Sequence, residues 1–177
     1  MPSLVEPAAQ LKESYVALVD EFVAAGEDLV PFCLGFPHDD FEALIARLSD
    51  HSRGLGVPEG FVANSTFWLV DDHLGVVGVS NVRHRLTAAL AREGGHIGFG
   101  VRPSCRRRGF GSLILKLSLA RARDLGISRA LLTCDRDNTG SVRVIIGNGG
   151  VLDSEEFLTE RHACVQRYWI ETDAQSA

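Results

Sequence analysis

The segment from His96 to Leu125 constrains the fold more than any other part of the chain. Residues 96–101 are expected to form a strand, and three consecutive arginines and the sequence Gly109-Phe110-Gly111 follow it. Apolar residues then recur at helical spacing, which predicts a helix over residues 111–125, and Gly126 is a typical helix stop. The chain therefore passes from a strand, through a cationic loop that contains glycines, directly into a long helix.

A junction of this kind is suited to binding an anion. The N-terminus of a helix offers unpaired N–H groups and a partial positive charge of about half an elementary unit. Glycines let the backbone approach a bound group closely, and a pyrophosphate also needs cationic partners. Taken alone, an arginine run is more often a solvated surface. The segment is neither a dinucleotide fingerprint, which would require glycine in place of Ile114, nor a P-loop.

Hydrophobic periodicity predicts further elements on both sides of this segment. Two helices come first, one over residues 10–25 and one that Asp39 or Asp40 could cap. Residues 86–92 give no clear pattern. The predicted order of helix, helix, strands, helix, strand, helix, strands indicates a mixed α/β or α+β domain around one central sheet. The remaining strands are expected at residues 66–70, 76–83, 130–134 and 162–170, and the remaining helix at residues 141–146.

Composition excludes several classes of protein. A length of 177 residues favours a single domain over residues 1–177, and a net charge of −5 argues against a nucleic-acid partner. The four cysteines form no Cys-x-x-Cys pair, so neither a metal site nor a disulfide framework is expected. The first residues do not resemble a signal peptide, and no apolar run is long enough to span a membrane. We therefore expect a cytoplasmic protein with no membrane partner.

The positions of the arginines and glycines resemble motif A of the GNAT superfamily of N-acetyltransferases, whose core is Gln/Arg-x-x-Gly-x-Gly/Ala. Arg106, Gly109 and Gly111 match that core. Asn138 matches the asparagine that follows the next strand in the family, and Gly149-Gly150 matches a later glycine-rich turn. The match to several landmarks in the right order makes the resemblance much more specific than the loop alone.

The likeness is closest to a branch of predicted acetyltransferases, which the chain resembles in Val-Arg-Pro-Ser at 101–104 and Thr-Cys-Asp-x-Asp-Asn at 133–138. It covers about residues 68–170 and is poor over the first sixty residues, where acceptor recognition varies in the family. The resemblance implies a single domain with a mostly antiparallel central sheet flanked by helices. Its parts would be a helical acceptor-side region (1–65), a coenzyme A-binding core (66–170) and a tail (171–177).

The resemblance also implies an activity and a site. Such enzymes move an acetyl group from acetyl-CoA to a primary amine by direct attack in a ternary complex, so acetyl-CoA is the expected co-substrate and no metal is expected. Backbone groups near the end of the strand would hold the pantetheine arm, as an added strand would. Asn138 would contact the pantetheine or a bound water, and Arg107 to Ser112 would enclose the pyrophosphate. The expected coenzyme-binding residues are Phe99, Gly100, Val101, Arg106, Arg107, Arg108, Gly109, Phe110, Gly111, Ser112, Asn138 and Ser141.

The amine must lose a proton before it attacks, and three residues are candidates for the base. His96 is the first, because its unperturbed pKa of about 6.5 suits a base at neutral pH. The alternative for His96 is a structural histidine that binds a neighbouring loop. Glu93 is the second candidate, with a solvated carboxylate as its alternative, and His84 is the third. Many relatives carry a tyrosine acid where this chain has Ile145, so we expect catalysis without one.

Two functions of different classes fit these patterns. The first is an enzyme that acetylates an amine, which could belong to a small metabolite, an antibiotic or a protein. The second is a non-catalytic sensor or regulatory module that binds acyl-CoA, and the missing tyrosine favours it. An RNA-binding role for residues 106–108 is opposed by the acidic net charge. A homodimer is compatible with the sequence.

Overall fold

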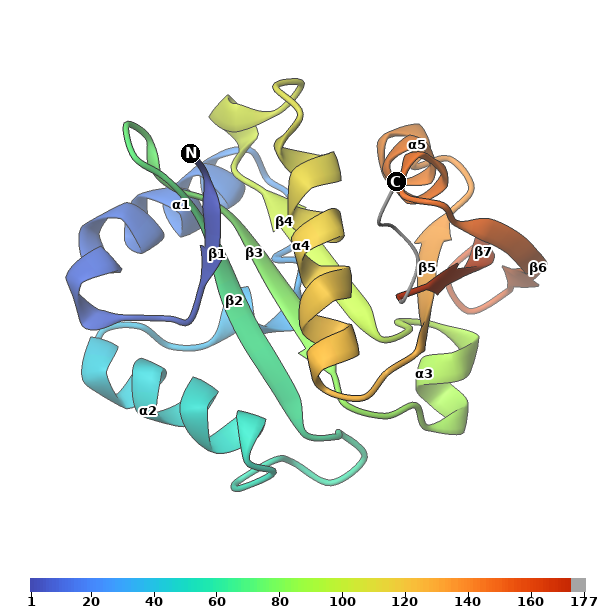
Figure 1. Ribbon diagram of the computed structural model, residues 1–177, viewed down its shortest axis with the longest axis horizontal. Helices are drawn as coiled ribbons and strands as arrows, with labels where there is room; N and C mark the ends of the chain where they lie inside the picture. Colours follow the sequence, from blue (N-terminus) through green and yellow to red (C-terminus); the bar gives the residue numbers. More distant parts are fainter. Residues whose placement is uncertain (173–177) are drawn as a thin grey trace.

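Two antiparallel sheets lie at the centre of the structure, a computed structural model that describes residues 1–172 (Figure 1). The first sheet has the strand order β1-β2-β3-β4, and the second has the order β5-β7-β6. The mixed α/β class predicted from the sequence is confirmed, but the strands divide into two sheets instead of one. The strands are β1 (Ser3–Val5), β2 (Asn64–Asp71), β3 (Gly75–Arg83), β4 (Ile97–Val101), β5 (Arg129–Asp135), β6 (Val151–Leu158) and β7 (Ala163–Glu171).

The two sheets meet where β4 begins. The N–H of His96 donates to the carbonyl of Leu131 in β5 at 2.7 Å. The N–H of Leu131 donates in return to Nδ1 of the His96 ring at 2.9 Å, and not to a main-chain carbonyl. On its other side, the carbonyl of His96 accepts a hydrogen bond from the N–H of Arg83 at 2.7 Å. From Ile97 onward, β4 pairs with β3 alone among the described strands, so β4 is the edge strand of its sheet.

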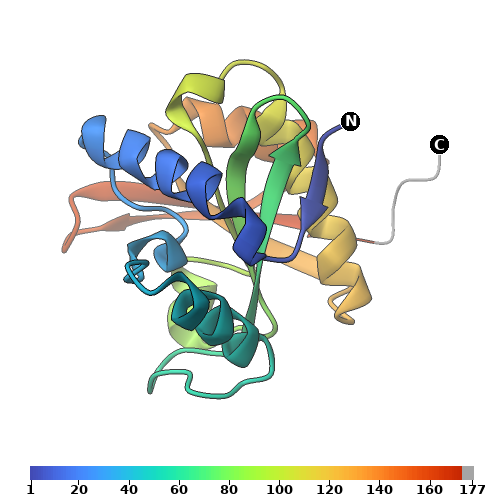
Figure 2. The same ribbon diagram turned by 90° about the vertical axis from the view of Figure 1, so that its left-hand side faces the viewer.

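Helices cover both faces of the first sheet (Figures 1 and 2). α1 and α2 pack on one face, α4 packs on the other, and α5 lies against α4. The strand side chains alternate accordingly: Trp68 is buried with α1 and α2, whereas Phe67 and Leu69 are buried with residues of α4. The helices are α1 (Lys12–Ala24), α2 (Phe41–Ser52), α3 (Ala88–Arg92), α4 (Phe110–Asp124) and α5 (Thr139–Gly147), with 3-10 turns η1 (Ala9–Leu11), η2 (Phe32–Gly35) and η3 (Pro103–Cys105).

The starts of the longer helices differ in how their first N–H groups are satisfied. Asp40, one of the two caps predicted for α2, accepts a hydrogen bond from the N–H of Ala43 at 3.0 Å. Asn138 caps α5 in the same way, with its Oδ1 3.0 Å from the N–H of Ser141. α4 begins instead after Gly109, which has a φ of 85° and offers no side-chain acceptor. The N-terminus of α4 therefore has no side-chain cap of this kind.

Three elements were not expected from the sequence. β1 has only three residues, which is too short to show a hydrophobic period. β6 is the outer strand of its sheet, and most of its side chains are exposed, so its alternation is weak. α3 is a single short helix inside the pattern-free residues 86–92, and Thr87 caps it.

The boundary predicted for the tail falls at the end of β7. β7 continues to Glu171, so the boundary placed at residue 171 falls on the last residue of a strand. Residues 173–177 of that tail lie outside the described part of the chain. Within residues 1–172, no helix combines the length and the hydropathy needed to cross a membrane.

Candidate active site

The N-terminus of α4 lies at the end of the predicted cationic loop. Gly109 and Arg107 both have positive φ, at 85° and 61°, so the backbone turns sharply before the helix. The first main-chain hydrogen bond of α4 runs from the N–H of Leu113 to the carbonyl of Gly109, at 3.1 Å. The N–H groups of residues 110–112 therefore have no carbonyl acceptor within the helix. These donors and the helix dipole together favour an anion at this point.

The three arginines of this loop have different surroundings. Arg106 binds both carboxylate oxygens of Glu27 at 2.7 and 2.6 Å, and its Nε donates to the carbonyl of Val101 at 3.0 Å. This ion pair lowers the pKa of Glu27. Arg107 and Arg108 form no ion pair with any carboxylate of residues 1–172. Arg106 thus anchors the loop beside α1, while the charges of Arg107 and Arg108 remain available.

A second carboxylate of α1 holds the start of the same loop. Glu21 accepts hydrogen bonds from Nε of Arg102 at 2.7 Å and from the N–H of Ser104 at 3.0 Å. These contacts join residues about eighty positions apart in the sequence, so no local pattern could have predicted them. Together with the Arg106 pair, they fix the loop against the first helix.

The outer edge of β4 runs toward this loop. The N–H of Arg102 donates to the carbonyl of Val77, and the N–H of Arg83 donates to the carbonyl of His96. Since hydrogen-bonded pairs alternate along an antiparallel pair of strands, the even-numbered residues of β4 turn their main-chain groups toward β3. The main-chain groups of Phe99 and Val101 therefore point to the open edge, where the carbonyl of Val101 already accepts a hydrogen bond from Arg106. Gly100 contributes differently, because a Cβ there would lie 2.2 Å from the carbonyl oxygen of Val30. Gly100 allows the segment before η2 to cross closely over the strand.

Gly111 lies where α4, α5 and β4 come together. A Cβ at this position would be 3.3 Å from Val144 of α5 and 3.9 Å from Val101 of β4. Asn148, just after α5, donates to Oγ of Ser112 at 3.2 Å and so links the two helices. The glycine therefore serves close packing as well as an open helix start.

The predicted residues of α5 lie at its first turn. Asn138 uses its Oδ1 to cap the helix, through the N–H of Ser141. Its amide Nδ2 forms no hydrogen bond with the described residues, so it is available as a donor. The position of the family tyrosine, Ile145, is fully buried in the core.

His96 is buried, and its ring joins the two sheets. Because Nδ1 accepts the N–H of Leu131, the proton of the neutral ring is assigned to Nε2. Burial, and then the charge of Arg83, lower the pKa of His96. The single lone pair of the neutral ring is therefore already engaged in a hydrogen bond. This geometry favours the structural alternative for His96 over the base.

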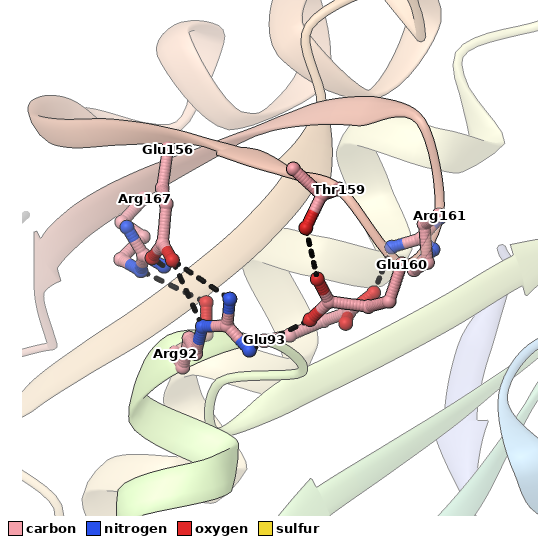
Figure 3. Close-up of polar contacts among 7 residues, drawn as sticks. All are labelled: Arg92, Glu93, Glu156, Thr159, Glu160, Arg161 and Arg167. Carbon is pink, nitrogen blue, oxygen red and sulfur yellow. Dashed lines mark hydrogen bonds and ion pairs between the residues drawn. The ribbon is translucent and has the colours of Figure 1, made fainter.

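Glu93 belongs to a network of ion pairs that connects α3 with the β6–β7 hairpin (Figure 3). Arg161, in the hairpin turn, contacts Glu93 and also binds Asp135 at the end of β5, at 2.9 Å. In a second cluster, Arg92 binds Glu156 and Glu160 at 2.8 and 2.7 Å, and Arg167 binds Glu156 at 2.6 Å. Exposed pairs of this kind contribute little stability individually. Their geometric effect is to hold the hairpin turn beside Glu93.

Glu93 also lines a cavity of about 180 Å³ between α3, η2 and the segment before β2. The sequence did not predict this cavity, because its walls come from four separate segments. A larger and more open hollow of about 450 Å³ lies between the starts of α1 and α2. The residues that line the smaller cavity are Phe32, Gly60, Phe61, Val62, Asn64, Arg83, Thr87, Ala89, Leu90 and Glu93.

Comparison with known proteins places this fold in one family. The model of the GNAT acetyltransferase family matches residues 20–147. No curated protein gave a match. Among solved structures, the chain is similar to an acetyltransferase of the GNAT family from Streptococcus pneumoniae, with 15% identity over 97% of this chain and 99% of that chain and a TM-score of 0.65.

Two further structures have the same fold. One is a protein from Salmonella typhimurium assigned as an acetyltransferase and solved with its cofactor acetyl-CoA (13% identity, 99% of this chain and 96% of that chain, TM-score 0.62). The other is a dodecameric spermidine N-acetyltransferase from Vibrio cholerae (14% identity, 97% and 94%, TM-score 0.62). At such low identity these likenesses establish the fold alone. The family model, however, spans well over half of the chain. The chain therefore belongs to the GNAT acetyltransferase family and is an acetyl-CoA-dependent N-acetyltransferase.

Proposed function

We propose that the protein acetylates a primary amine by direct attack, with acetyl-CoA bound between the open edge of β4 and the uncapped start of α4. The observation that carries this proposal is the position of Gly109: a left-handed residue without a side chain opens the helix start beside Arg107 and Arg108. A Cβ added at Gly109 would meet no atom within 4 Å, so space is available there. Acetyl-CoA supplies an activated acetyl group on a thiol leaving group.

The surrounding residues fit the coenzyme. Main-chain donors at residues 110–112 and the charges of Arg107 and Arg108 suit a pyrophosphate. The outward main-chain groups of Phe99 and Val101 suit the amides of a pantetheine arm, which would pair as an added strand does. Asn138 would add a donor from α5. Arg106, in contrast, would act indirectly by anchoring the loop to Glu27.

Glu93 is the better candidate for the base that removes the proton of the amine. Glu93 lines the cavity, and only its Oε1 forms a hydrogen bond with the described residues, to Arg161. Oε2 is therefore available to accept a proton directly or through water. His96 would keep β4 in position beside β5. This reverses the order in which the sequence ranked the two residues.

Transfer needs neither a tyrosine acid nor a cysteine nucleophile in this proposal. Both tyrosines, Tyr15 and Tyr168, are buried, and the hydroxyl of Tyr168 donates to Gln166 at 2.6 Å. Burial raises the pKa of Cys134 to about 11, so little thiolate forms there at neutral pH. A thiol with a pKa of about 8.5 is a tolerable leaving group without a dedicated acid.

The alternative function is a sensor that binds acyl-CoA without transferring the acyl group. The observation that favours it is the burial of Ile145, which leaves no acid at the position where many relatives have one. A thiol-release assay with acetyl-CoA and a panel of amines separates the two functions. Release that depends on an amine supports the enzyme, and tight acetyl-CoA binding with no release for any amine supports the sensor.

The Glu93→Gln variant tests the assignment of the base. We expect kcat to fall by about 10²–10⁴-fold while the Kd of acetyl-CoA stays unchanged. The loss should shrink as the pH rises, because a growing fraction of the amine is already deprotonated. Glu160→Gln is the matched control, since Glu160 also pairs with an arginine near the hairpin turn, Arg92, and does not line the cavity. An unchanged kcat for Glu93→Gln would place the base elsewhere.

A further inference from the structure

The cavity beside Glu93 has walls suited to an apolar group. Phe32, Phe61, Val62 and Leu90 are among the residues that line it. Its volume of about 180 Å³ is slightly larger than that of an engineered cavity that accommodates benzene, which is roughly 150 Å³. The cavity can therefore hold one aromatic ring or one branched aliphatic chain, but not a long flexible molecule.

A half-buried cation lines the same cavity. Arg83 uses Nη1 to donate to the carbonyls of Gly94 and Gly95, at 2.8 and 3.0 Å. Its guanidinium forms no ion pair with any carboxylate of residues 1–172. Burial lowers the pKa of Arg83, so its charge is held in unfavourable surroundings. Two other partly buried arginines, Arg102 and Arg167, each bind a carboxylate.

The remaining donors of Arg83 suit a planar anion. A guanidinium carries five N–H groups, and those on Nε and Nη2 form no hydrogen bond with the described residues. Nη2 lies toward Gly98 of β4, at 3.7 Å from the point where a Cβ would be. The fork geometry of the remaining donors matches a carboxylate.

We infer that the amine acceptor is an amino acid with a free carboxylate and an apolar side chain. Its carboxylate binds Arg83, its side chain fills the cavity, and its ammonium lies toward the carboxylate of Glu93. This inference rests on the proposed function, because it assigns the acceptor of the same site. Arg83 would repel a polyamine, which carries several positive charges and no anion.

Calorimetric binding in the presence of CoA tests this inference without turnover, since CoA carries no acetyl group. The probes are L-phenylalanine and L-phenylalaninamide, compared at mildly acidic pH, where both α-amines are protonated and the two differ only in the anionic group. We expect the acid to bind roughly ten- to a hundredfold more tightly than the amide, as for a hydrogen bond to a charged group. Equal or tighter binding of the amide, tighter binding of spermidine, or no binding of the acid would overturn the inference.

Two arginine variants test whether Arg83 causes the tighter binding of the acid. Arg83→Gln should remove the preference for the acid, whereas Arg85→Gln, at an exposed position two residues along the same chain, should keep it. Because Arg83 also holds the loop at Gly94, its variant could fail to fold. Leu90→Trp then serves instead: it should fill the cavity and abolish binding of the acid while acetyl-CoA still binds. Retained binding of the acid in Leu90→Trp would contradict the assigned cavity.

The outcomes also separate this inference from the proposed function. If L-phenylalanine binds more tightly than its amide but thiol release never depends on an amine, the assigned ligand is correct and the proposed acetyl transfer is wrong. If another amine is acetylated while the acid does not bind, transfer stands and the assigned acceptor is wrong.

Discussion

At the residue scale, the ring of His96 shows how one side chain can join two sheets. The ring takes the place of a main-chain carbonyl as the acceptor for Leu131, at the point where the two sheets separate. The sequence predicted His96 as the first residue of a strand, and the structure places it one residue before β4. Its partner was not predictable, because Leu131 lies 35 residues away and belongs to the other sheet. Local caps such as Asp40 were predictable because donor and acceptor are three residues apart.

Substitution of His96 separates a structural role from a catalytic one. In His96→Asn the amide oxygen of the new side chain can replace Nδ1 as the acceptor, but the amide cannot act as a base. We expect this variant to keep stability and kcat near those of the wild type. His96→Ala should lose about 1–3 kcal/mol of unfolding free energy, because the buried N–H of Leu131 is left without a partner. Chemical denaturation and thiol release measure the two effects. A loss of a hundredfold or more in kcat for His96→Asn would restore His96 as the base.

Three histidines should make stability depend on pH. Burial lowers the pKa of His51, His84 and His96, with the charges of Arg47 and Arg83 adding to the effect at His51 and His96 respectively. The unfolded chain, with a histidine pKa of about 6.5, therefore binds more protons than the folded one when the pH falls. Their contribution is complete above pH about 6.5 and is lost as the pH falls through the lowered pKa values.

Denaturation of the wild type and His96→Asn between about pH 5 and 7.5 checks this dependence. The unfolding free energy of the wild type should decrease on acidification, by at most about 1.4 kcal/mol per pH unit for each histidine. The variant lacks one titrating group and should show a smaller slope. Identical slopes in the two proteins would exclude a contribution from His96.

At the scale of elements, the unit of β4, loop and α4 was the most predictable part of the chain. The strand expected at 96–101 begins one residue later in the structure, and the helix expected at 111–125 begins and ends one residue earlier. Glycines and helical periodicity are local signals, which explains this accuracy. The roles of the three arginines were not predictable, because Glu27 lies far away in the sequence. β6 escaped prediction because an exposed edge strand has little apolar alternation.

Two arginine variants test how this element binds the coenzyme. Arg107→Asn removes the charge, and asparagine tolerates the positive φ of 61° at this position. We expect it to weaken acetyl-CoA binding by about 1–3 kcal/mol with little change in stability. Arg106→Ala should instead cost at most about 1 kcal/mol of stability, since its ion pair with Glu27 is partly exposed. Calorimetry measures the acetyl-CoA affinity of each variant, and denaturation measures its free energy of unfolding. Unchanged affinity in Arg107→Asn would remove Arg107 from the site.

At the scale of the whole molecule, the division into two sheets creates the open edge on which the proposed site depends. The sequence identified the class of fold and the family through local motifs, but the split between β4 and β5 depends on how distant segments meet. The same limit applies to the cavity beside Glu93, whose walls are distributed over four segments. We propose that all parts, from the acceptor-side helices to β7, act as one domain.

The central claim is that acetyl-CoA binds at the open start of α4, and a pair of glycine variants tests it. Gly109 and Gly126 lie at opposite ends of α4, both have positive φ (85° and 82°), and a Cβ at either would meet nothing within 4 Å. Gly109→Val and Gly126→Val should therefore impose similar backbone strain, of about 1–2 kcal/mol.

Calorimetric titration of acetyl-CoA into the wild type and the two folded variants is the most direct measurement. The wild type and Gly126→Val should bind acetyl-CoA with similar affinity, and the ligand should raise the melting temperature of both. Gly109→Val should show no binding, because its side chain blocks the approach of the pyrophosphate to the helix start. Equal affinity in all three proteins would contradict the proposed site.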